Sequence, residues 1–168
     1  MKKSGFIALA LLAGTALNAT TANANDYLTG YIGWHDFIDD EAESTELGVE
    51  YRFHPLAYGF RPTLGFNVTT EGSMYGYGGF NWDVPVIDNQ LYVIPNFMVG
   101  LYGEGDGKDL GGAIEFRSGL EVAYQMPNEH RIGIAINHIS NASIYDKNPG
   151  AETLLVNYSM PIGRMFQY

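Results

Sequence analysis

The chain has 168 residues, no cysteine and a formal net charge of −10, and 46% of its residues are hydrophobic. Such an excess of acidic residues argues against nucleic acid as a partner, because phosphate binding needs concentrated Lys and Arg, and the lack of cysteine excludes disulfides and thiolate chemistry. Beyond the N-terminal segment no stretch approaches ~18 consecutive apolar residues, which excludes ordinary membrane helices but not a membrane barrel.

Residues 1–24 have the three parts of a secretory signal. Lys2 and Lys3 precede an apolar run, and the small-residue sequence ANA follows and ends at Ala24. The run is too short to cross a bilayer as a helix. We therefore predict cleavage after Ala24, which leaves residues 25–168 as a single domain.

Eight stretches of the remaining chain alternate between apolar and polar residues with a period of two, and turn-rich segments separate them. In the clearest stretch, Leu47 and Val49 share one face while Glu46 and Glu50 share the other. Several stretches reach the ~9–11 residues that a tilted strand needs to cross the hydrocarbon. The predicted strands are 26–38, 46–54, 58–68, 73–84, 90–102, 110–124, 130–142 and 151–168.

The placement of charge predicts that these strands close into a barrel. Charged residues on the faces opposite the apolar rows would pair inside an eight-stranded barrel, which has room for side chains but not for a wide pore. They are Glu46, Glu50, Arg52, Arg61, Glu115, Arg117, Glu121 and Arg131. We predict an all-β, eight-stranded antiparallel transmembrane β-barrel. The alternative, a periplasmic β-sandwich or lipocalin-like barrel, would need polar outward rows.

The end of the chain indicates where the barrel is inserted. The terminal sequence GRMFQY resembles the assembly signal of bacterial outer-membrane barrels, in which a glycine precedes aromatic or apolar residues and the last residue is usually Phe or Tyr; here these are Gly163, Phe166 and Tyr168. We expect the outer membrane of a Gram-negative bacterium, with both termini on the periplasmic side. The extracellular loops would then be 38–44, 69–73, 103–109 and 143–150.

One predicted lipid-facing row ends in polar residues. In the seventh strand three isoleucines share a face with His138 and Ser140, whereas Arg131 has the opposite parity and belongs in the lumen. Glu152 starts the outward row of the eighth strand. Antiparallel pairing across the short loop 143–150 would bring it beside His138, at the level of the outer leaflet.

These three residue types suit ester hydrolysis. His138 would take the proton from Ser140 as the hydroxyl attacks an ester carbonyl, and Glu152 would hold the other nitrogen of the imidazole. Each of the three alone is more often inert at a membrane interface. The nearest donors for the developing oxyanion are Asn141, Asn148 and the backbone at Gly150.

The stretch NHISNASIYDKNPGAE, residues 137–152, resembles the signature of the outer-membrane lipid A 3-O-deacylase family (PagL type). In that family a His-x-Ser-Asn-Ala run is followed by Asn, Gly and a Glu twelve residues beyond the Ser. The resemblance implies the catalytic triad His138, Ser140 and Glu152 on the outside of the barrel, with Asn148 and the Asn141 region at the oxyanion site. It also implies lipid A as the substrate and loss of the 3-hydroxyacyl chain at its 3 position.

Other readings of the sequence stay open at this point. A small non-catalytic barrel that contacts a surface partner through its loops would share the architecture, and so would another lipid esterase, a phospholipase or a lipid A palmitoyltransferase. No spacing of ligands indicates a metal, and no phosphate loop indicates a cofactor. Three histidines, His35, His54 and His130, are predicted to be structural or interfacial. The sequence leaves the oligomeric state open, a homodimer included.

Overall fold

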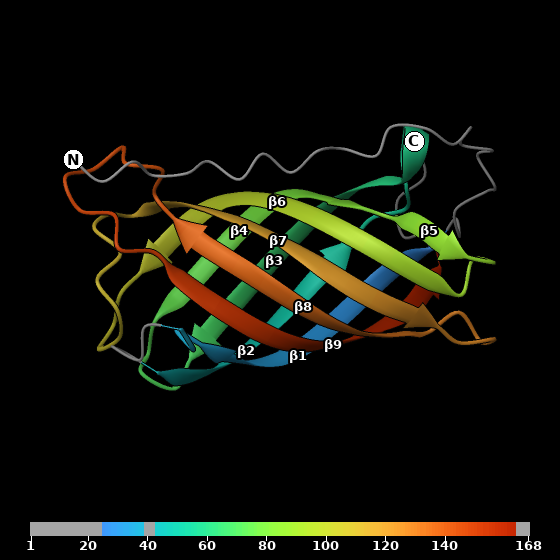
Figure 1. Cartoon of the computed structure of the whole chain (residues 1–168), viewed down its shortest axis with the longest axis horizontal. Coiled ribbons are helices and arrows are strands. Elements are labelled where there is room, and N and C mark those ends of the chain that lie inside the picture. The colour runs from blue at the N-terminus through green and yellow to red at the C-terminus, as the bar shows by residue number, and fades with distance from the viewer. Residues whose placement is uncertain (1–24, 39–42, 164–168) are drawn as a thin grey trace, which may run out of the picture.

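The computed structural model describes residues 25–38 and 43–163, so the predicted signal peptide and the aromatic terminus, Phe166 and Tyr168, lie outside the described residues. Nine strands and one short 3-10 turn make up the described chain (Figure 1). The strands are β1 (Asp26–His35), β2 (Ser44–Arg52), β3 (Phe60–Thr69), β4 (Met74–Trp82), β5 (Val84–Ile87), β6 (Leu91–Gly103), β7 (Ile114–Gln125), β8 (Arg131–Ser140) and β9 (Ala151–Gly163).

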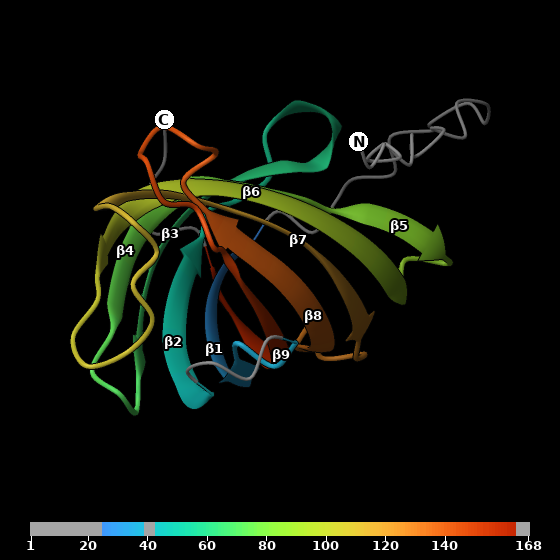
Figure 2. The ribbon, with the colours of Figure 1, turned by 60° about the vertical axis from the view of Figure 1, so that its left-hand side comes forward.

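Eight of these strands form a closed antiparallel barrel, as the alternation predicts. Each strand pairs with its neighbours in the sequence, β1 pairs with β9, and β4 pairs with β6 to complete the ring. The strands cross the long axis of the barrel obliquely (Figures 1 and 2), which closure requires. The four-residue β5 pairs with β6 alone and extends the sheet beside the ring.

The two faces of the wall differ as the sequence predicts. Outward rows are exposed and apolar, for example Ile132, Ile134 and Ile136 on β8. The eight charged residues assigned to the lumen are all buried. An exposed apolar belt around a closed barrel is the surface of a protein that spans a bilayer.

Ion pairs fill the lumen in two layers. Near the end that carries Asp26 and Gly163, Asp83 accepts hydrogen bonds from Arg61 at 2.6 Å and Arg131 at 2.8 Å. Farther along, Arg52 bridges Glu50 at 2.7 Å and Glu121 at 2.8 Å. Buried charges of this kind are stable only when paired, so the interior is a packed core and no channel.

Several strand boundaries differ from the prediction. β1 ends at His35, before the predicted residue 38, because Asp36 takes a left-handed conformation with φ 57°. β7 starts at Ile114, four residues later than predicted, since Gly111 has φ 94°. The strand β5 is absent from the prediction, because four residues containing a proline give no clear period.

Loops 70–73, 104–113 and 141–150, together with residues 36–38 after β1, lie at the end of the barrel opposite Asp26 and Gly163. No helix within the described part of the chain is long and apolar enough to cross a membrane.

Candidate active site

The candidate site lies on the outer face of the wall formed by β8 and β9. The ladder between these strands places Ile136 opposite Leu154 and His138 opposite Glu152, as the antiparallel pairing predicts. His138 therefore continues the exposed isoleucine row, while its neighbour Asn137 is buried in the lumen. The end of this apolar row carries an imidazole and a carboxylate side by side.

The side chains of His138 and Glu152 are joined by a direct hydrogen bond. Nδ1 of the imidazole lies 2.9 Å from Oε1 of the carboxylate, and the two side chains are 47% and 24% exposed. Because an ionised carboxylate only accepts hydrogen bonds, Nδ1 donates to Glu152, and in the neutral imidazole Nε2 then carries no hydrogen. This arrangement presents Nε2 as an available base.

Ser140 is the last residue of β8 and lies two positions beyond His138 on the same face. Its side chain is half-buried, and its cross-strand partner on β7 is Phe116. Among the described residues no hydrogen bond joins the Ser140 hydroxyl to His138. Since residues i and i+2 of a strand are ~6.5 Å apart at their Cα atoms, rotation about χ1 of Ser140 governs whether the hydroxyl reaches Nε2.

Gly150 forms the wall against which the imidazole rests. A Cβ atom added at this position would lie 2.8 Å from Cε1 of His138 and 3.5 Å from its Nε2. The backbone here also has φ 71°, which favours glycine. Both observations explain why a glycine precedes Ala151 and Glu152 at the start of β9.

The side chain of Asn141 holds the loop between β8 and β9 in place. Its buried amide donates to the carbonyl oxygens of Leu110 and Lys147, both at 2.7 Å, and its Oδ1 accepts the backbone N–H of Ser143 at 3.0 Å. Both hydrogens of the amide are thus used within the loops. An oxyanion role for Asn141, expected from the sequence, stays a prediction, and in this structure its side chain holds the loop.

Asn148 is the more available of the two asparagines. Its Oδ1 accepts the backbone N–H of Asn141 at 2.9 Å, and its amide nitrogen lies 3.3 Å from the Ser143 hydroxyl. The residue is exposed at the mouth of the loop. One amide hydrogen of Asn148 therefore has no partner among the described residues.

An ion pair joins this loop to the neighbouring loop 104–113. Nζ of Lys147 lies 2.6 Å from Oδ2 of Asp109. The Lys147 ammonium and the N–H of Gly111 hold the pKa of Asp109 below its usual value, and Asp109 raises the pKa of Lys147. Both groups are exposed, so this pair orients the loops more than it stabilises the fold.

Strand pairing also brings a second serine to the site, which sequence reasoning missed. Ser118 on β7 lies directly opposite His138 and is exposed. The sequence does contain an indication of this position. Phe116, Ser118 and Leu120 form one outward row that is apolar except for the Ser118 hydroxyl. Recognising its position required the register between β7 and β8.

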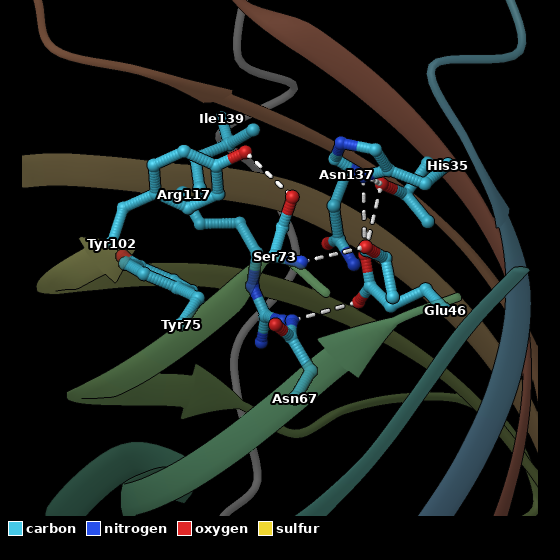
Figure 3. Close-up of a pocket in the computed structure, with 11 residues that line it drawn as sticks. His35, Glu46, Asn67, Ser73, Tyr75, Tyr102, Arg117, Asn137 and Ile139 are labelled. Atoms are coloured by element: carbon cyan, nitrogen blue, oxygen red, sulfur yellow. Dashed lines mark hydrogen bonds and ion pairs between the residues drawn. The ribbon is translucent and has the colours of Figure 1, made fainter. Parts of the chain in front are cut away.

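The inner face of the barrel carries a different cluster, formed by residues of β1, β2 and β9 (Figure 3). Nδ1 of His35 lies 3.3 Å from Oε2 of Glu46 and 3.1 Å from the hydroxyl of Thr153, the residue after Glu152. The cavity beside this cluster has a volume of about 10 Å³. Such a space is too small for an acyl chain and accommodates about one water molecule.

The other two histidines lie near the opposite end of the barrel, and both have protein partners. Nδ1 of His54 lies 3.0 Å from Oδ1 of Asp26, and Nδ1 of His130 lies 2.8 Å from the hydroxyl of Tyr158. These contacts agree with the structural or interfacial roles predicted for them.

The comparison with solved structures agrees with the fold. The crystal structure of the outer membrane enzyme PagL superposes with a TM-score of 0.59 at 17% identity, covering 81% of this chain and 99% of that chain. A de novo designed transmembrane β-barrel gives 0.57 at 8% identity, covering 82% and 96%, and Neisserial surface protein A gives 0.53 at 11% identity over the same shares. At these identities the likeness concerns the fold alone.

The family comparison is more specific. No curated protein matches the sequence. The family model described as "Lipid A 3-O-deacylase (PagL)" matches residues 44–161, which is most of the chain and includes all of β8 and residues 151–161 of β9. Together with the membrane-barrel fold, this match identifies an outer-membrane protein of the Gram-negative type, and the chain belongs to the lipid A 3-O-deacylase (PagL) family.

Proposed function

We propose that this barrel is a lipid A 3-O-deacylase, a serine esterase that hydrolyses the ester-linked 3-hydroxyacyl chain at the 3 position of lipid A. The observation that carries the proposal is the 2.9 Å bond between His138 and Glu152 on the lipid-facing side of the wall, with Ser140 on the same row. Membership of the family supports the same reaction.

The first half of the reaction transfers the acyl chain to Ser140. Nε2 of His138 takes the hydroxyl proton as Oγ attacks the ester carbonyl, and Glu152 stabilises the imidazolium that forms. The tetrahedral intermediate collapses when the oxygen at the 3 position of the sugar leaves and receives that proton from His138. The products of this step are the 3-deacylated lipid A and an acyl-Ser140 ester.

Water completes the cycle. His138 accepts a proton from water, the hydroxide adds to the acyl-Ser140 carbonyl, and Ser140 leaves with the proton returned by the imidazolium. The released product is a 3-hydroxy fatty acid. In both halves the oxyanion accepts hydrogen bonds from the exposed amide of Asn148 and the backbone N–H of Gly150, while Asn141 keeps the loop that carries them in place.

The position of the site supplies a route for the substrate. We infer that the end of the barrel opposite Asp26 and Gly163 is extracellular, which puts His138, Ser140 and Glu152 at the outer leaflet. Lipid A fills that leaflet and would reach the site by lateral diffusion, with its chains against the outward apolar rows. A palmitoyltransferase that holds an acyl chain inside the barrel is disfavoured, because the lumen is packed with ion pairs.

Mass spectrometry of lipid A tests the proposal. Gram-negative cells that express the wild-type chain should lose one 3-hydroxyacyl mass from lipid A, whereas cells expressing Ser140→Ala should keep it at the same level of folded barrel. Ser159→Ala, which removes a buried hydroxyl bonded to Thr29 inside the lumen, is the matched control and should deacylate like the wild type. Unmodified lipid A in wild-type cells would refute the function, and normal deacylation by Ser140→Ala would refute the nucleophile.

A further inference from the structure

Ser118 is the one outward hydroxyl of β7 next to the candidate active site. It lies opposite His138 in the β7–β8 ladder, and His138 lies opposite Glu152 in the β8–β9 ladder, so one row across three strands carries a hydroxyl, an imidazole and a carboxylate. Directly opposed Cβ atoms in antiparallel strands are ~4.5–5.5 Å apart. Ser118 therefore lies within the reach of any group bound at His138.

The surroundings of Ser118 are apolar. Its outward neighbours on β7 are Phe116 and Leu120, and its partner on β6 is Phe97, which is 55% exposed. Within the described chain the Ser118 hydroxyl has no hydrogen-bond partner in another residue. A lone hydroxyl in a lipid-facing row is therefore available to a ligand.

Ser118 lies on the side of the His138 imidazole that faces away from Nε2, the nitrogen that acts as the base. Glu152 occupies Nδ1, and the Cε1–Nε2 edge faces Gly150 at the start of β9. Ser118 approaches His138 from the opposite side, on β7. It is therefore placed to contact the substrate beyond the reacting carbonyl and does not compete with Ser140 for Nε2.

The tilt of the strands puts Ser118 in the path of an acyl chain. A line from the end of β8 parallel to the long axis of the barrel passes from β8 onto β7 (Figure 1). Chains in a bilayer run mainly along that axis. An acyl group held at Ser140 would then extend over Ser118, whose Cβ is the diagonal neighbour of the Ser140 Cβ at ~7–8 Å.

We propose that Ser118 is a specificity-determining residue that recognises the hydroxyl group of a 3-hydroxyacyl chain by a hydrogen bond. This inference rests on the proposed function. The hydroxyl of such a chain lies two carbon atoms beyond the scissile carbonyl, close enough to Ser140 to meet a group on the adjacent strand. An unsubstituted acyl chain presents only hydrogen atoms there and leaves the Ser118 hydroxyl without a partner in an apolar setting, which is unfavourable.

Two esters that differ by one hydroxyl test the proposal. The detergent-solubilised barrel would be assayed with p-nitrophenyl 3-hydroxydecanoate and p-nitrophenyl decanoate, and the ratio of their kcat/KM values measured. We expect the wild type to prefer the hydroxylated ester roughly 3–10-fold, the contribution of one neutral hydrogen bond. Ser118→Ala should bring this ratio close to one, and Ser118→Thr, which keeps a hydroxyl, should restore most of it.

Leu120→Ala is the matched control, since it shortens the next outward side chain of β7 without removing a hydroxyl, and it should leave the ratio as in the wild type. A ratio that Ser118→Ala leaves unchanged would overturn the proposal, and so would an equal loss with both esters, which a merely structural role predicts. A wild-type barrel inactive toward both esters would overturn the proposed function and this inference with it. Activity on both esters without any preference overturns the inference alone.

Discussion

Two His–Glu pairs lie on opposite faces of the barrel, one in the lumen and one on the outside, and the comparison separates a structural pair from a candidate catalytic one. Inside, His35 and Glu46 are 6% and 5% exposed, and Thr153 and Asn67 hydrogen-bond to His35 and Glu46 respectively. Outside, His138 and Glu152 are hydrogen-bonded to each other, and Nε2 of the imidazole has no hydrogen-bond partner among the described residues. A buried pair of this type holds strands together, whereas an exposed one with a free base can act on a substrate.

Replacement of each histidine by alanine should give the largest difference between the two His–Glu pairs. We expect His138→Ala to lower kcat at least ~10³-fold, because the base is lost, while the barrel keeps its stability. His35→Ala should keep the activity within a few-fold but destabilise the barrel by about 1–3 kcal/mol, because Glu46 loses a buried partner. Deacylation assays and urea unfolding in detergent measure the two effects; an exchange of the two outcomes would refute the assignment.

The two carboxylates make a second matched pair. Glu152→Gln should lower kcat by ~10²–10⁴-fold, because a neutral amide neither fixes the imidazole tautomer nor stabilises the imidazolium. Glu46→Gln should alter kcat little, although the midpoint of thermal unfolding should fall. Equal kcat values for the two variants would remove Glu152 from the mechanism.

A substitution at Gly150 tests whether catalysis needs the His138 imidazole in the position where the loop between β8 and β9 holds it. Gly150→Ala adds a Cβ 2.8 Å from Cε1 of His138, and we expect kcat to fall about 10–100-fold because small displacements of a catalytic group are costly. Gly72→Ala is the control, since Gly72 also has a positive φ, 80°, but has open space around its Cβ position. Similar losses in both variants would assign the effect to backbone strain alone.

The pH dependence of kcat should distinguish the His138–Glu152 pair on the outside of the barrel from the Asp109–Lys147 ion pair of the loops. Protonation of His138 removes the base, so kcat should fall about tenfold per pH unit once the imidazole is protonated. The Asp109–Lys147 pair behaves differently: the lowered pKa of Asp109 means that its contribution is present above the unfolded pKa and is lost only as the pH falls through the lower folded value.

Lys147→Gln should therefore change activity the least of these variants and leave the acid limb of the profile where it is in the wild type. Steady-state rates from pH 5 to 8 give both curves. A flat wild-type profile down to pH 4 would argue for another base, and an acid limb that moves with Lys147→Gln would assign it to the loops.

Most of the wall could be predicted from the sequence because strand alternation is a local property. Each inward charge and each outward isoleucine has a parity that its neighbours fix, so Arg131 and Ile132 were assigned to opposite faces correctly. The pairing of His138 with Glu152 followed from one short loop and from antiparallel strands.

The features of the site that could not be predicted from the sequence depend on contacts between distant segments. Asn141 donates to Leu110 from a different loop, and no local pattern in the sequence indicates this contact. Ser118 lies in a separate strand twenty residues before His138, and only the β7–β8 register joins them. Turn residues such as Asp36 ended strands earlier than alternation alone predicts, because a single left-handed residue breaks the ladder.

Labelling of the nucleophile tests the central claim most directly. The intact barrel in detergent would be treated with an alkyl fluorophosphonate, which phosphonylates an activated serine hydroxyl, and the modified peptide identified by mass spectrometry. The exterior triad predicts one adduct, on Ser140, that disappears in His138→Ala and persists in His35→Ala. Labelling of Ser118 in place of Ser140, or no labelling of an active barrel, would contradict the account.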